Sequence, residues 1–130
     1  MLTIRNEQML VFRRNLEHEF IERLADRLEI VFPDRAAALG RAAVEKQAGS
    51  AYSRARSYGL NSKSDVIRFV DVDFVVGADF ENAPDMKWAL LMLQDDDLSP
   101  ANKIFRLTRR LQLRGIGIYP DKKEGTTSAR

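Results

Sequence analysis

The sequence contains no cysteine and a single histidine, His18. Without cysteine the chain can form no disulfide bond, thiolate zinc site or iron–sulfur cluster, and it has no cysteine nucleophile. A single imidazole also excludes every metal site that needs two or more histidine ligands. We therefore predict a protein without a bound metal or other cofactor.

Long hydrophobic runs are also missing. The longest unbroken apolar run, from Trp88 to Leu93, is far shorter than the roughly 20 residues that a membrane-spanning helix requires. The segment from Met1 to Asn15 carries charges every few positions and has no apolar stretch typical of a secretory signal. We expect a cytoplasmic protein that does not associate with membranes.

Neither sign of charge is in clear excess. The chain has 21 Lys and Arg residues against 19 Asp and Glu residues, a net charge of +2 at pH 7. A nucleic-acid-binding domain usually has a clustered excess of basic residues, so this balance does not favour such a partner. The 45% hydrophobic content excludes a fully disordered chain. The length predicts one helical domain over residues 1–118, followed by a flexible polar tail over residues 119–130.

The most regular pattern predicts a long amphipathic helix over Glu7–Phe32. Asn6 is a suitable N-cap, and Pro33 is expected to end the helix because the residue before a proline disfavours the helical conformation. The apolar residues of this helix recur at steps of three and four. They are Met9, Phe12, Leu16, Phe20, Leu24, Leu28 and Val31.

Further helices are predicted between capping residues. Ser62, with Asp65 three residues later, and Ser99, followed by Pro100, are typical helix starts. The predicted segments are a short helix over 34–40 and longer helices over 41–58, 84–93 and 100–113. With the segment discussed next, they predict an all-α compact bundle of about five main helices with a long N-terminal helix.

The segment from Asp65 to Val76 fits both a helix and a strand. The alternation of valine and aspartate over residues 70–73 favours a strand. The spacing of Val66, Val70 and Phe74, together with the cap at Ser62, favours a helix. No other segment has the pattern of a partner strand, and a lone strand would leave its backbone groups unpaired. We therefore predict a helix.

Few residues indicate catalysis. His18 lies off the apolar stripe and is expected to be solvated rather than a metal ligand. In a helix Asp71 and Asp73 would point about 200° apart, which does not suit a shared metal ion. The three aspartates at 95–97 fit a loop between helices. The sequence has no Gly-x-Ser-x-Gly elbow and no glycine-rich phosphate loop, so we predict that the protein is not an enzyme.

Opposite charges gather in neighbouring segments of the C-terminal half. Residues 98–114 include one lysine and four arginines without an acid, whereas residues 79–97 include six acids and one lysine. Such an asymmetry favours internal pairing or the docking of a protein partner. Because tryptophan and arginine are frequent interface anchors, we predict partner binding at Phe80, Trp88, Arg106, Arg109 and Arg110. The alternative, that Trp88 is a core residue, has at least equal support.

A series of short residue groups extends along most of the chain, between about Leu2 and Leu111. They are Ile4-Arg5-Asn6-Glu7-Gln8-Met9, Phe32-Pro33, Leu39-Gly40, Ala55-x-x-Tyr58-Gly59-Leu60, Asp65-Val66, Phe69-Val70-Asp71, Phe74, Gly77-x-Asp79-Phe80, Pro84, Trp88-Ala89 and Leu98-x-Pro100. In order and spacing, these groups resemble a family of small bacterial proteins encoded beside type VI secretion spike and PAAR-tip genes. This chain departs from the family pattern at Asp73, where an apolar residue is usual, and at Lys87, where a proline is usual.

The resemblance implies a helical protein that acts beside a secreted effector, and it brings no catalytic motif. It suggests an adaptor or chaperone that holds an effector or spike-tip protein in the producing cell. The alternative is an immunity protein that binds and neutralises a cognate secreted toxin, often through complementary charge. A third class, an enzyme such as a wall hydrolase, has no residues in this chain that we can name for it.

Overall fold

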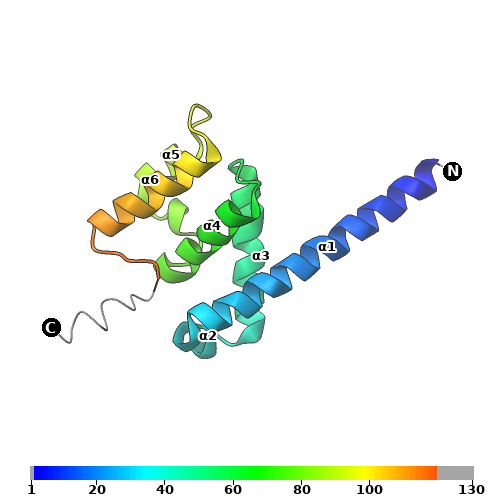
Figure 1. Cartoon of the computed structure of the whole chain (residues 1–130), viewed down its shortest axis with the longest axis horizontal. Coiled ribbons are helices and arrows are strands. Elements are labelled where there is room, and N and C mark those ends of the chain that lie inside the picture. Colours follow the sequence, from blue (N-terminus) through cyan, green and yellow to red (C-terminus); the bar gives the residue numbers. More distant parts are fainter. Residues whose placement is uncertain (1, 120–130) are drawn as a thin grey trace. The chain divides into compact units, whose positions relative to one another are not determined.

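The computed structural model describes the backbone of residues 2–119 and the side chains of residues 14–119. These residues form six α-helices, two short 3-10 helices and no strand, so the predicted all-α fold class is confirmed (Figure 1). The elements are α1 (Leu2–Val31), α2 (Pro33–Leu39), α3 (Arg41–Ser57), α4 (Lys63–Val76), η1 (Phe80–Asn82), η2 (Pro84–Met86), α5 (Lys87–Leu93) and α6 (Pro100–Leu113). Of the predicted tail, residues 120–130 lie outside the described residues.

By its internal contacts the chain divides into two units, residues 1–46 and residues 47–130, with the boundary inside α3. The single domain predicted over residues 1–118 therefore stays a prediction. Among the described helices, none is both long enough and apolar enough to cross a membrane.

The first unit consists of α1, α2 and the start of α3, and α2 packs against α1 (Figure 1). Arg41, the first residue of α3, pairs with Glu45 at 2.7 Å, with Asp26 at 2.8 Å and with Glu29 at 3.0 Å. Two of these acids lie on α1. Because solvent screens such pairs, they fix the start of α3 on α1 more than they stabilise the fold.

The long helix α1 differs from its prediction at its start. It begins at Leu2, upstream of the predicted N-cap Asn6, because residues 2–5 contain no glycine or proline that would interrupt a helix. Its end at Val31 agrees with the stop signal, and Pro33 then occupies the first position of α2. Along the predicted stripe Leu24 and Leu28 are buried and Leu16 is exposed. The side chains of Met9 and Phe12 lie outside the described residues.

Helix α4 resolves the ambiguity over residues 65–76 in favour of the predicted helix. Ser62 is the N-cap, and its hydroxyl accepts a hydrogen bond from the backbone N–H of Asp65 at 3.1 Å. Every residue from Phe69 to Phe74 is buried. A stretch of helix that is buried on every side needs no polar face, so the helical spacing of polar and apolar residues expected of a surface helix is missing over residues 69–74.

The prediction of one helix over residues 84–93 is wrong at its start. Residues 84–86 form the 3-10 helix η2, and α5 begins at Lys87. Met86, the last residue of η2, has backbone angles outside the helical range (φ −113°, ψ 22°), so the two elements do not form one continuous helix. Helix α6 agrees with its prediction: Ser99 caps it through the N–H of Asn102 at 3.2 Å, and Pro100 is its first residue.

We predict that the two leucines on opposite faces of α6 differ strongly in their effect on stability. Leu107 is fully buried, whereas the Leu113 side chain is 76% exposed. Leu107→Ala should lower the free energy of unfolding by about 2–5 kcal/mol because it opens a cavity. Leu113→Ala, the control on the same helix, should change it by no more than about 0.5 kcal/mol. Urea denaturation followed by circular dichroism measures both, and equal effects would contradict the described orientation of α6.

Candidate functional site

A buried charge cluster lies at the centre of the second unit, around Arg54 of α3. The guanidinium of Arg54 binds both carboxylate oxygens of Glu81, at 2.8 and 3.1 Å, and also the carboxylate of Asp73. Glu81 lies on η1 and Asp73 on α4, and both side chains are fully buried. The exposed carboxylate of Asp79 lies 3.4 Å from the Arg54 side chain.

The remaining polar atoms of the cluster also have partners. The Tyr58 hydroxyl donates a hydrogen bond to Glu81 at 2.7 Å. Asp73 accepts hydrogen bonds from the Gln47 side chain at 3.3 Å and from the backbone N–H of Asp79 at 2.9 Å. This network satisfies both carboxylates, which is the condition under which buried charge is tolerated.

Burial and charge act in opposite directions on the pKa values of this cluster. Burial raises the pKa of Asp73, and the Arg54 guanidinium opposes that rise. Burial also raises the pKa of Tyr58, and its hydrogen bond to Glu81 adds to the effect. Burial alone would lower the pKa of Arg54, but Glu81 and Asp73 reverse this and raise it above its ordinary value. The cluster therefore holds its charges by mutual pairing and serves the fold.

Asp71 and Asp73 of α4 have separate partners, as expected for two side chains that point in different directions from one helix. Asp71 accepts a hydrogen bond from the Tyr119 hydroxyl at 2.7 Å, whereas Asp73 binds Arg54. His18 lies in the other unit, and its exposed side chain lies 3.7 Å from the carboxylate of Glu22, one helical turn away. Within the described part of the chain, no group of three or more metal-ligating side chains is placed to hold an ion.

Phe80, one of the predicted partner-binding residues, lies in the core. Its side chain is only 3% exposed, and its ring centroid lies 5.5 Å from that of Phe69. The physical reason is the next residue, since Glu81 is drawn inward by Arg54 and fixes the turn that carries Phe80. Phe80 is therefore not available to a partner in this structure, which corrects its assignment to the binding surface.

Trp88 fits neither prediction completely, because it is neither a fully buried core residue nor a fully exposed interface anchor. Its side chain is half-buried on α5, and the guanidinium carbons of Arg110 and Arg114 lie 4.8 and 5.1 Å from its ring centroid. Both arginines are exposed. Stacking on an aromatic ring orients a guanidinium and offsets part of the repulsion between two such cations. The Trp88 indole N–H is buried without an acceptor among the described residues.

Further basic and apolar side chains lie on the exposed side of α6, next to Arg110 and Arg114. Arg106, Arg110 and Arg114 follow one another at four-residue spacing, and Phe105, Arg109 and Leu113 do the same beside them. Phe105 is 58% exposed and Leu113 is 76% exposed. None of the four arginines forms an ion pair with a described residue. We call these six residues and Trp88 the arginine face.

The arginine face is suited to bind carboxylates on another molecule. A guanidinium presents a planar fork of N–H donors that matches a carboxylate, and stacked arginines lose less side-chain freedom on binding. Exposed Phe105 and Leu113 add apolar surface between the charges. Of the predicted binding residues, the structure stacks Arg110 on Trp88, exposes Arg106 and Arg109 on α6 and buries Phe80 in the core.

Several of these residues were not predicted from the sequence. Arg114 and Leu113 could have been found, because they continue the four-residue spacing of Arg110 and Arg109. Arg54 and Glu81 carry no local signal, since their partners are distant in the sequence.

In comparisons with known proteins, no protein family, curated protein or solved structure matches the chain. The candidate site therefore rests on its own geometry.

We predict that Arg54→Met is strongly destabilising and that acid reduces its effect. At neutral pH the variant should lose about 3–5 kcal/mol of stability, because two buried carboxylates remain without a counter-charge. Without Arg54, burial raises the pKa of Asp73 further, because only the hydrogen bonds from Gln47 and from the Asp79 backbone still oppose it. The folded variant therefore binds protons more tightly than its unfolded state. This proton-linked stability is present at low pH and is lost as the pH rises through the folded-state pKa.

The difference in unfolding free energy between wild type and Arg54→Met should therefore narrow from about pH 7 to about pH 4.5, which denaturant titrations at several pH values can measure. Arg56→Met is the matched control, because Arg56 lies exposed on the same helix and its guanidinium bonds to Tyr52 but to no carboxylate of the described residues. It should cost no more than about 1 kcal/mol at either pH. A gap that widens in acid would contradict the structural role of the Arg54 pairs.

Proposed function

We propose that this chain is a non-catalytic, cytoplasmic protein-binding module that docks an acidic protein surface through the arginine face. The observation that carries the proposal is the pair of guanidinium groups held on the Trp88 ring with no acid beside them among the described residues. Cations that are already oriented and unpaired favour a carboxylate from another molecule.

The composition of the face supports a protein partner over a nucleic acid. Interface anchors are enriched in tryptophan and arginine, and here exposed Phe105 and Leu113 lie among them. Non-specific binding of single-stranded nucleic acid usually uses several exposed stacking rings along a basic groove. On this face the only strongly exposed ring is Phe105, since Trp88 is half-buried under two arginines.

The identity of the partner is proposed from the sequence resemblance. We propose an adaptor or chaperone for a type VI secretion effector or for the spike or PAAR-tip protein encoded beside it. The alternative is an immunity protein that blocks a cognate toxin. The two roles differ in one measurable respect, because an immunity protein abolishes toxin activity at one equivalent and an adaptor does not.

We predict that reversing two charges on the arginine face abolishes partner binding. The chain is co-expressed with the neighbouring effector and tip proteins, and the affinity of each purified complex is measured by titration calorimetry. Arg110→Glu combined with Arg114→Glu should weaken binding at least about 100-fold, because two charge-assisted hydrogen bonds are lost and repulsion replaces them. The affinity of the wild type should fall as salt is added.

The matched control is Lys63→Glu combined with Arg68→Glu. Both residues are exposed on α4 in the same unit, and this pair changes the net charge by the same amount. It should bind like the wild type. Arg109 belongs to the arginine face but is not stacked on Trp88. A loss of binding in Arg109→Glu would therefore come from the lost charge and not from altered packing of the tryptophan. Equal affinities in the two double variants would exclude the arginine face, and tight salt-dependent binding of RNA or DNA in place of either protein would overturn the proposed function.

A further inference from the structure

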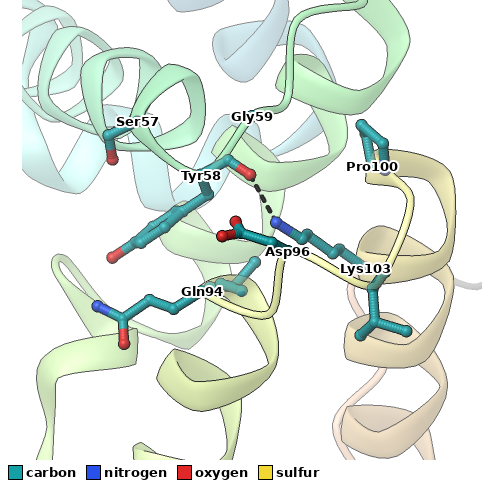
Figure 2. A pocket seen from close by; sticks show the side chains of 9 residues that line it. Ser57, Tyr58, Gly59, Gln94, Asp96, Pro100 and Lys103 are labelled. Atoms are coloured by element: carbon teal, nitrogen blue, oxygen red, sulfur yellow. Dashed lines mark hydrogen bonds between the residues drawn. The ribbon is translucent and has the colours of Figure 1, made fainter.

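A second candidate site lies in the same unit but shares no residue with the arginine face. It is a pocket of about 500 Å³, which is within the usual range for small-molecule sites. Three chain segments meet around it: the end of α3, the end of α5 with the following loop, and the start of α6 (Figure 2). The residues that line it are Ser57, Tyr58, Gly59, Leu93, Gln94, Asp96, Leu98, Pro100 and Lys103.

Lys103 places a buried positive charge in this pocket. Its side chain is only 5% exposed, and its ammonium group donates one hydrogen bond, to the backbone carbonyl of Tyr58 at 2.9 Å (Figure 2). An ammonium group has three donors, and the other two have no acceptor among the described residues. No carboxylate of the described chain pairs with it. A buried cation with unused donors favours an anion that enters the pocket.

Asp96 supplies the opposite charge. It lies in the loop between α5 and α6 and lines the same pocket, yet its carboxylate forms no hydrogen bond or ion pair with a described residue. The pocket therefore holds one cation and one anion that are not paired with each other. Leu93 and Leu98 provide apolar surface beside them.

We infer that this pocket binds a small zwitterion with an α-amino and an α-carboxylate group, such as a free amino acid. The ligand carboxylate accepts hydrogen bonds from Lys103, and the ligand ammonium group binds Asp96. The ligand side chain then lies toward Leu93 and Leu98. A ligand of this kind binds the buried ammonium group of Lys103 and the exposed carboxylate of Asp96 at once, whereas a simple anion would bind Lys103 alone.

Titration calorimetry with each of the common amino acids tests this inference. At least one should bind with one-to-one stoichiometry, and its N-acetyl and amide forms, each of which lacks one charge, should bind at least about tenfold more weakly. Asp96→Asn should weaken binding of the amino acid by at least about tenfold and leave binding of the N-acetyl form unchanged, because that form has no ammonium group for Asp96.

Asp97→Asn is the matched control, since Asp97 lies next to Asp96 in the loop, loses the same charge and does not line the pocket. It should bind the amino acid like the wild type. Lys103→Met should abolish binding of both the amino acid and its N-acetyl form. Lys103→Met could fail to fold because the hydrogen bond to Tyr58 is lost. In that case the inference is still tested by comparing how Asp96→Asn binds the amino acid and its N-acetyl form. Absence of binding by every amino acid up to about 10 mM, or equal binding of the N-acetyl form, would overturn the inference.

Discussion

The second unit depends on one interaction, the pairing of the Arg54 guanidinium with Glu81 and Asp73. It joins three elements that are distant in the sequence, α3, α4 and the 3-10 turn η1. Buried ion pairs add little net stability compared with apolar residues, but they are directional, and an incomplete set is costly. In a chain without disulfide bonds, we interpret this cluster as the device that selects one arrangement of these elements over other helical packings.

Burial makes the distribution of charge uneven although the composition is nearly neutral. Asp71, Asp73 and Glu81 are completely buried, so their charges do not reach the solvent. The arginines of α6 remain outside without acidic partners among the described residues. The overall balance of charge, which does not favour an anionic partner, therefore conceals an uneven distribution between the interior and the surface. Net charge describes the chain, whereas binding depends on where each charge lies.

Local signals in the sequence predict most of the helices, because caps and proline act over a few residues. Ser62, Ser99 and Pro33 each have the expected effect. Local signals do not predict the position of a residue that is set by contacts with distant parts of the chain. Phe80 is of a residue type that is common at interfaces, yet the hydrogen bonds between Arg54 and the neighbouring Glu81 hold Phe80 in the core. No pattern in the sequence pairs residues that are 27 positions apart.

Helix α6 carries the key cations of both candidate sites, and burial gives those cations different chemistry. Lys103 in its first turn is enclosed and held by the carbonyl of Tyr58, so it acts as a fixed point charge for a ligand small enough to enter a pocket. Arg110 and Arg114, at its other end, stack on Trp88 and direct planar forks of donors outward, which suits carboxylates on a large surface. The amphipathic pattern that packs α6 thus also sorts its cations by accessibility. That sorting makes a small ligand and a protein partner compatible on one helix, because neither needs a residue that the other uses.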